Sequence, residues 1–179
     1  GGLARHGLGY AELSQVNPWL VYLSISAFGQ DGPDAARPGY DAMIQGMGGL
    51  MSLTGAPDGE PGAGPQKVGV AVADLMCGMY AVSAILAALY ERDRSGQGQY
   101  IDLSQTEAAL HFLAPAFLDW TVNGRIPEPI GNADADHLVH GIFRADGEDR
   151  WLAIAARDEG QRRALCLAIG RPDLGDLPE

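Results

Sequence analysis

Apolar residues dominate the stretch from Lys67 to Arg92, and two different patterns follow one another within it. Val68 to Val72 is a short run rich in β-branched residues, which predicts a buried strand. Leu75 to Tyr90 is almost entirely apolar and rich in leucine, alanine and methionine, which favours a helix. Because this helix has no polar face, we expect it to be buried on essentially every side, with some of its surface left uncovered in this chain alone.

Five further elements are predicted before residue 121. They are a helix over Tyr10–Val16, a strand over Leu20–Ala27, a helix over Tyr40–Met47, a strand over Gln99–Leu103 and a helix over Ser104–Trp120. Strands that alternate with helices are typical of α/β folds, so we predict a mostly parallel sheet. The segment Gly55–Gly64 is rich in glycine and proline and reads as a mobile surface loop.

The pattern changes after Trp120, and we divide the chain there. Residues 1–120 are assigned to part of a large α/β domain, and residues 121–140, which are polar and rich in proline and glycine, to a linker. Beyond it, Gly141–Ala145 and Arg150–Ala156 read as a hairpin, and Asp158–Gly170 has helical spacing. So small a ββα unit buries little apolar surface, so residues 141–179 should be the start of a small, incomplete α+β domain.

Composition narrows the classes of function. The 46% apolar content is that of a globular protein, and the formal net charge of −11 argues against a nucleic-acid partner, which needs clustered lysine and arginine. Cys77 and Cys166 lie far apart in presumed helices, so we expect no disulfide and a reducing, cytoplasmic setting. His137 and His140 stand near acidic residues in the linker, and we interpret them as solvated loop residues; no metal site is expected.

The two ends of the chain and the long apolar run bear on its setting. No targeting segment is visible, and the run Leu75–Tyr90 falls short of the roughly 20 residues of a membrane span, so a buried helix is favoured and no membrane partner is expected. The chain starts with Gly-Gly and ends with Pro-Glu. We therefore expect an internal piece of a larger protein.

Asp74 stands where the predicted strand passes into the predicted helix, and two interpretations of it stay open. A buried charge costs several kcal/mol unless it is paired, so something must hold this carboxylate. It could be an N-cap, held by the unsatisfied amides of the first helical turn. It could instead be a catalytic carboxylate at the mouth of the helix, kept ionised and directed into a cleft.

Four stretches of the chain carry a resemblance to a known family. They are NPWLVYLSISAFGQDGP (Asn17 to Pro33), RPGYDAMIQGMGGLMSLTG (Arg37 to Gly55), KVGVAVADLMCGMYAVSAILAALYER (Lys67 to Arg92) and SGQGQYIDLSQTEAAL (Ser95 to Leu110). In this order they resemble the class III CoA-transferases, the superfamily of formyl-CoA:oxalate and carnitine CoA-transferases and of α-methylacyl-CoA racemase. The resemblance implies a Rossmann-like large domain and an interlocked homodimer with a shared active site. It also implies that coenzyme A and acyl-CoA are substrates, with a carboxylic acid as second substrate and no permanently bound cofactor. Members of that family are more than twice as long, so we expect the piece alone to be inactive.

The resemblance also implies roles for single residues. In transferases of that family the aspartate at the place of Asp74 is the covalent nucleophile. Tyr40 and Asp41 stand where formyl-CoA transferase has a tyrosine and a glutamate that line its active site. Gly48 and Gly49 are candidates to line the same site. Physical chemistry explains three of these residues equally well, Asp41 as a first-turn acid and the glycines as a helix C-cap.

Tyr40 separates the branches of the family. The racemase branch has at this place a histidine that acts as a proton-transfer base, so its absence favours transfer of CoA over racemisation. A racemase or epimerase with Asp74 as one base is the alternative enzyme. A hypothesis of another class is a non-catalytic assembly fragment that pairs through the apolar helix Leu75–Tyr90.

Overall fold

The computed structural model describes residues 2–176. The chain divides into two compact units, one made of Gly1–Thr54 and Pro65–Glu128, the other of Gly55–Gly64 and Pro129–Glu179. The predicted surface loop Gly55–Gly64 therefore goes with the second unit. Its Gly55 carbonyl oxygen accepts a hydrogen bond from the Gly131 N–H at 2.9 Å.

The first unit is built on two parallel strands, β1 (Val21–Ser26) and β2 (Gln99–Ser104), as the sequence predicts. Their register pairs Val21 with Gln99 and Ser26 with Ser104, so both strands end at the same edge. Helix α1 (Tyr10–Val16) brings Tyr10 to within 6.1 Å of the rings of Tyr22 and Tyr100, measured between ring centroids. The unit is thus mixed α/β with a small parallel sheet, which confirms the predicted class at that level.

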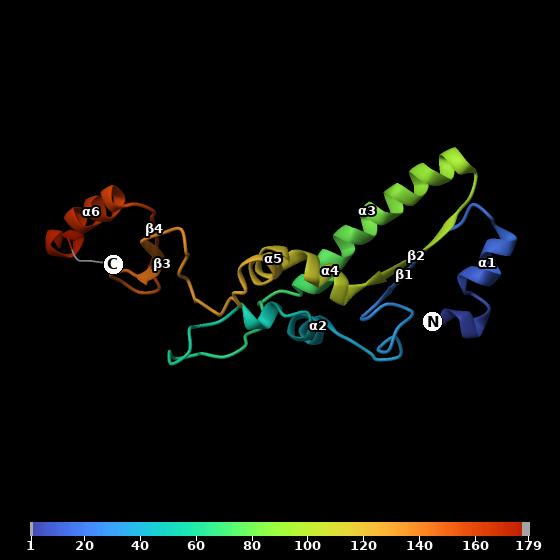
Figure 1. Cartoon of the computed structure of the whole chain (residues 1–179), viewed down its shortest axis with the longest axis horizontal. Helices are drawn as coiled ribbons and strands as arrows, with labels where there is room; N and C mark the ends of the chain where they lie inside the picture. Colours follow the sequence, from blue (N-terminus) through green and yellow to red (C-terminus); the bar gives the residue numbers. More distant parts are fainter. Residues whose placement is uncertain (1, 177–179) are drawn as a thin grey trace. The chain divides into compact units, whose positions relative to one another are not determined.

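Helix α3 (Val72–Ser95) runs alongside the two strands (Figure 1) and packs against both, as well as against α2 (Asp41–Met47) and α4 (Gln105–Phe112). By length and apolar content alone it could cross a membrane, since its 24 residues extend beyond the apolar run seen in the sequence. A mostly buried core helix of a soluble protein passes the same test, and α3 packs on both strands along one face.

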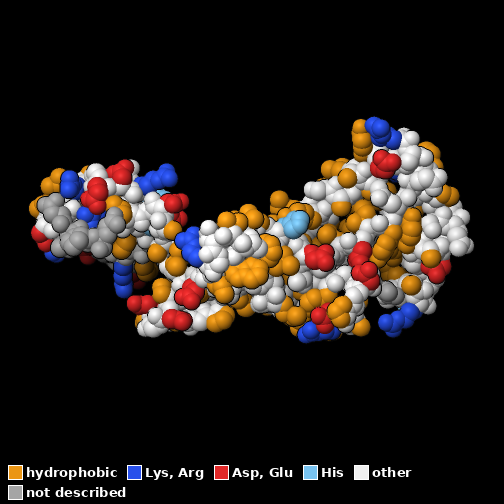
Figure 2. Space-filling model, in the orientation of Figure 1, with side chains coloured by type: hydrophobic (Ala, Val, Ile, Leu, Met, Phe, Trp, Pro, Cys, Tyr) orange, Lys and Arg blue, Asp and Glu red, His pale blue; other side chains and the backbone are white. Residues whose placement is uncertain are grey.

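Part of the apolar surface of this helix is uncovered in this chain, as predicted, and its burial on every side stays a prediction for the longer protein. Its buried residues are small and share one face: Ala73, Cys77, Ala81 and Ala88. The opposite face carries what we call the α3 stripe, whose members are each 58–66% exposed: Leu75, Met79, Val82, Leu86 and Tyr90. Figure 2 shows apolar side chains at the surface over α3 and α5. Small side chains let α3 approach the strands closely, and nothing among the described residues covers the larger ones.

The prediction of a strand over Val68–Val72 is wrong. The segment before α3 forms hydrogen bonds with a side chain instead of with another strand. The amide of Gln45 accepts a hydrogen bond from the Val68 N–H at 2.9 Å and donates one to the Val70 carbonyl at 3.2 Å. One side chain thereby takes the place of a neighbouring strand. Val70 is 58% exposed, so the β-branched run is not a buried strand.

The predicted helix Ser104–Trp120 is interrupted. Helix α4 ends at Phe112, and α5 (Ala114–Asn123) begins after Leu113, with Pro115 in its first turn. Proline lacks an N–H and restricts the residue before it, so it is tolerated at the start of a helix and breaks the interior of one. Two short 3₁₀ helices, η1 (Leu3–His6) and η2 (Leu50–Ser52), complete this unit.

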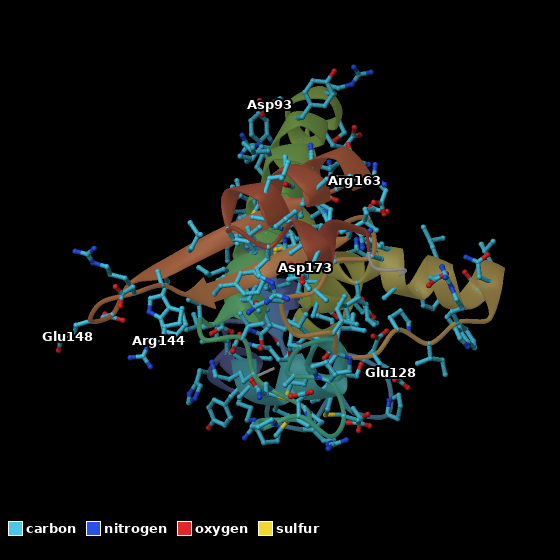
Figure 3. All side chains as sticks on the ribbon, turned by 90° about the vertical axis from the view of Figure 1, so that its left-hand side faces the viewer. Asp93, Glu128, Arg144, Glu148, Arg163 and Asp173 are labelled. Carbon is cyan, nitrogen blue, oxygen red and sulfur yellow. The ribbon has the colours of Figure 1, made fainter. Side chains whose placement is uncertain are left out.

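The second unit contains the predicted hairpin and helix. Strands β3 (Val139–Arg144) and β4 (Trp151–Ala156) are antiparallel, and Arg144 and Glu148 point outward at their turn (Figure 3). Helix α6 (Glu159–Ala168) is capped by Asp158, whose Oδ1 accepts from the Gln161 N–H at 2.9 Å, and η3 (Pro172–Asp176) follows. The helical spacing was predicted from the sequence, and the structure adds that Asp158 is the N-cap.

Candidate functional site

Asp74 lies in the first turn of α3, but its side chain does not cap the helix. The N-cap residue is Ala71, whose side chain accepts no hydrogen bond from the first-turn amides. The Asp74 Oδ1 instead accepts a hydrogen bond from Nε2 of Gln105 at 2.6 Å, and the residue is exposed. The N-cap interpretation is therefore wrong, and the carboxylate is held by a side chain of another helix.

Asp41, from a different helix, does the capping. Its Oδ1 accepts from the N–H groups of Ala73 at 2.9 Å and Asp74 at 3.3 Å. These are first-turn amides of α3 that have no partner within the helix. Asp41 stands in the first turn of α2, so the beginnings of α2 and α3 meet at this carboxylate. Asp41, predicted to line the site, thus fixes the backbone of Asp74.

Gln45 completes this arrangement, although no sequence argument singled it out. It is fully buried, and its Nε2 donates to the Asp41 Oδ2 at 2.6 Å. The same amide also holds Val68 and Val70. A glutamine four residues after an aspartate is an i,i+4 pair on one helix face, and that spacing was the signal available.

Helices α3 and α4 pack against each other. Asp74 contacts Gln105, and six residues further along each helix the ring of Tyr80 lies edge-on to that of His111, with centroids 5.3 Å apart. The starting ends of both helices therefore meet at Asp74 and Gln105, and their partial positive charges favour an anion there. Because α4 starts directly after β2, this end is also the carboxyl edge of the parallel strands, where α/β folds commonly place ligands.

The remaining predicted site residues fall at both ends of α2. Tyr40 directly precedes α2 at the Asp41 end and is 76% exposed. Gly48 and Gly49 follow its last residue, about 10 Å further along the axis. A Cβ at Gly48 would lie 2.8 Å from the Ile44 carbonyl oxygen, and Gly49 has φ +89°. Close packing and a left-handed turn account for the two glycines.

Replacing Gly48 tests this packing directly. Gly48→Ala is expected to lower the free energy of unfolding by about 1–3 kcal/mol, because the new methyl also meets the Ala109 Cβ at 3.3 Å. Gly46→Ala, inside α2, is the matched control. Its Cβ would lie 3.5 Å from the Met51 Sδ, an ordinary contact, and alanine is favoured over glycine in a helix by roughly 0.5–1 kcal/mol. Urea unfolding curves should show opposite signs; a shift of the same sign in both variants would contradict the packing argument.

Cys77 is the nearest reactive side chain to Asp74 along α3. It is 1% exposed, and burial, followed by the charge of Asp74, raises the pKa of its thiol. A protonated, buried thiol is a poor nucleophile and a poor metal ligand. Cys77 therefore does not compete with the carboxylate for the chemistry of this site.

The histidines of the second unit contact local partners. His137 Nδ1 lies 2.7 Å from Asp134 Oδ1, and this hydrogen bond is the main cause that lowers the pKa of Asp134. His140 Nδ1 lies 2.5 Å from the Asn132 carbonyl oxygen. Within residues 2–176, no three His, Cys, Asp or Glu side chains gather in a way that could hold a metal ion.

Known proteins resemble this chain along its whole length. The family model described as CoA-transferase family III matches residues 1–179. Succinate–glutarate CoA-transferase of Agrobacterium fabrum is 44% identical over 98% of this chain and 42% of its own length. Acetyl-CoA:oxalate CoA-transferase of Acetobacter aceti is 38% identical over 99% and 44%.

Solved structures agree with the sequence matches. A CAIB/BAIF family protein from Brucella suis is 41% identical, with a TM-score of 0.89 over 99% of this chain and 45% of that one. Rv3272 from Mycobacterium tuberculosis is 27% identical, with a TM-score of 0.72 over 98% and 44%. The chain thus spans less than half the length of these relatives. It belongs to CoA-transferase family III.

Proposed function

We propose that the protein containing this chain is a CoA-transferase that moves CoA from an acyl-CoA to a free carboxylic acid, with Asp74 as the covalent nucleophile. The observation that carries the proposal is the state of Asp74. Its carboxylate is exposed, and a different aspartate, Asp41, caps the helix that bears it. A carboxylate that caps no helix and lies at the start of two helices is available as a nucleophile.

The reaction would proceed in balanced steps through Asp74. Oδ2 attacks the thioester carbon of the donor, the C–S bond breaks, and CoA leaves as a thiolate, which gives a mixed anhydride. The thiolate then attacks Cγ of Asp74 and expels the donor acid, which leaves an aspartyl-CoA thioester. The acceptor carboxylate attacks this Cγ and releases the thiolate, which takes the new acyl group and frees Asp74. Covalent catalysis thereby divides one difficult exchange into easier ones.

The names of the relatives support a class of acids. They include transferases named for glutarate, oxalate, D-citramalate and mesaconate, all with two carboxyl groups, and several use succinyl-CoA by name. We therefore place dicarboxylic acids first among the acceptors to be tested. In the natural protein we further propose a Rossmann-like large domain that extends this first unit, a homodimer, and no permanently bound cofactor.

Isotope exchange distinguishes transfer from racemisation. With Tyr40 in place of a histidine base, the natural protein should move CoA from succinyl-CoA to labelled glutarate and leave the α-proton of a 2-methylacyl-CoA in place in deuterated water. Mass spectrometry of the CoA esters reads both outcomes from one incubation. Deuterium incorporation without CoA exchange would assign the site to a racemase.

A further inference from the structure

We propose that Gln105 is a positioning residue for Asp74 whose side-chain amide donates to the carbonyl oxygen of each aspartyl intermediate. The inference rests on the proposed function, since it requires Asp74 to carry the acyl group and CoA in turn. It assigns a task to a residue that neither the sequence pattern nor the family resemblance singled out.

The contact itself fixes which atoms face each other. Gln105 Nε2 lies 2.6 Å from Asp74 Oδ1. An ionised carboxylate only accepts hydrogen bonds, so the NH₂ group of the amide must be the part that faces it. Among the described residues Oδ2 has no hydrogen-bond partner, so the bond to Oδ1 leaves Oδ2 as the attacking atom. Bonds of this charged type are shorter and stronger than neutral ones.

The backbone around Gln105 is fixed on both sides. The preceding residue, Ser104, is buried and its hydroxyl donates to the Ala27 carbonyl at 3.4 Å. The following residue, Thr106, donates to the same carbonyl through its N–H at 3.1 Å and its hydroxyl at 2.7 Å. Three donors on one carbonyl at the end of β1 hold the start of α4 in place. The Gln105 amide is therefore presented from a rigid position.

Asp74 is fixed from the other direction, since Asp41 holds its N–H. Donor and acceptor are thus each anchored to a different part of the first unit, one through β1 and the other through α2. Preorganisation of this kind is what makes a hydrogen-bond donor effective in catalysis, because no reorganisation is needed as charge develops.

The chemistry then follows from the identity of Oδ1. Once Oδ2 has attacked, Oδ1 is the carbonyl oxygen of the anhydride and later of the thioester. Each attack on Cγ, by thiolate or by acceptor acid, moves an electron pair onto Oδ1. The tetrahedral intermediate collapses when that pair re-forms the carbonyl and expels the leaving group. The amide N–H of Gln105 stabilises the negative oxygen in both steps.

The test removes the donor while keeping the shape of the side chain. In Gln105→Met, the natural protein mixed with succinyl-CoA and no acceptor should form its CoA adduct at Asp74 about 10²–10³-fold more slowly, as when one oxyanion donor is lost. Quenched-flow samples analysed by intact-protein mass spectrometry give the rate. The KM for succinyl-CoA should change little, because the donor acts on the reacting oxygen.

Gln105→Glu tests hydrogen-bond donation through the pH dependence of the adduct rate. A merely structural role of Gln105 would leave that pH dependence unchanged. An ionised glutamate cannot donate, whereas a protonated one can, so the rate relative to wild type should rise as pH falls from about 8 to about 5. This variant also keeps the test decisive if the methionine variant does not fold.

Asn123→Leu is the matched control. Asn123 Nδ2 donates to Asp119 Oδ1 at the same 2.6 Å, on α5 of the same unit, and its loss should leave the adduct rate within about twofold. Wild-type rates in Gln105→Met, or a flat relative pH profile in Gln105→Glu, would overturn the inference. A wild-type protein that transfers CoA without any adduct at Asp74 would instead overturn the covalent mechanism beneath it.

Discussion

Replacing Asp74 by asparagine should abolish CoA transfer and leave the protein folded. Asparagine keeps the shape and removes the nucleophile, so turnover is expected to fall by about 10⁴-fold or more, as for other covalent catalytic residues. The structure explains why stability should not change. The carboxylate of Asp74 caps nothing, and the N–H of residue 74 keeps its bond to Asp41. The free energy of unfolding should stay within about 0.5 kcal/mol of wild type.

Two measurements complete this experiment in the natural protein. Hydroxylamine added during turnover should trap the acyl group as a hydroxamate at Asp74. Asp93→Asn makes the same chemical change at an exposed position in the last turns of α3 and should transfer CoA within about twofold of wild type. Near-normal turnover in Asp74→Asn would show that Asp74 is not the covalent nucleophile.

The largest effect on stability is expected at Gln45, a residue outside the reaction. Gln45→Leu leaves three groups without their buried partner: the Val68 N–H, the Val70 carbonyl and one oxygen of Asp41. Each unsatisfied group costs about 1–3 kcal/mol when it stays buried, and the exposed Val70 can recover water. We expect a loss of about 2–4 kcal/mol in the free energy of unfolding, measured by urea denaturation.

The exposed Gln97 provides the comparison for this change. Gln97→Leu should alter the free energy of unfolding by less than about 0.5 kcal/mol. Because Gln45 also holds Asp41, its replacement should loosen the start of α3, visible as faster hydrogen exchange at the N–H groups of Ala73 and Asp74. Equal stability losses at positions 45 and 97 would show that the Gln45 hydrogen bonds do not support the fold.

Periodicity was sufficient to predict most elements, and it failed where a side chain replaced a strand. The run Val68–Val72 has the composition of a buried strand, yet its hydrogen bonds go to Gln45, which lies more than twenty residues earlier in the chain. Local pattern carries no information about such a partner. The interruption of the predicted helix Ser104–Trp120 has a local cause. Pro115 lies in the interior of the predicted helix, where proline breaks a helix, and the structure places it in the first turn of α5, where proline is tolerated.

The candidate site shows the same limit. The position of Asp74 in the sequence identified it as a carboxylate that needed a partner. The first-turn amides of its own helix were the partners that the sequence suggested. Those amides are taken by Asp41, and the partner of Asp74 is Gln105, some thirty residues later. Both assignments depend on how α2, α3 and α4 meet in space. A sequence pattern identifies which residues require partners, and tertiary packing decides which partners they receive.

Cys77 has a consequence for the lifetime of acylated protein. An anhydride or thioester at Asp74 would be an electrophile one helical turn from this thiol, on the same side of α3. Only a thiolate would attack it, and burial, the larger cause of the raised pKa of Cys77, persists after acylation removes the charge of Asp74. On the proposed mechanism, neither intermediate would then be diverted into a dead-end thioester of the protein's own sulfur. The CoA held as a thioester at Asp74 would wait for the next carboxylic acid, even when that acid is scarce.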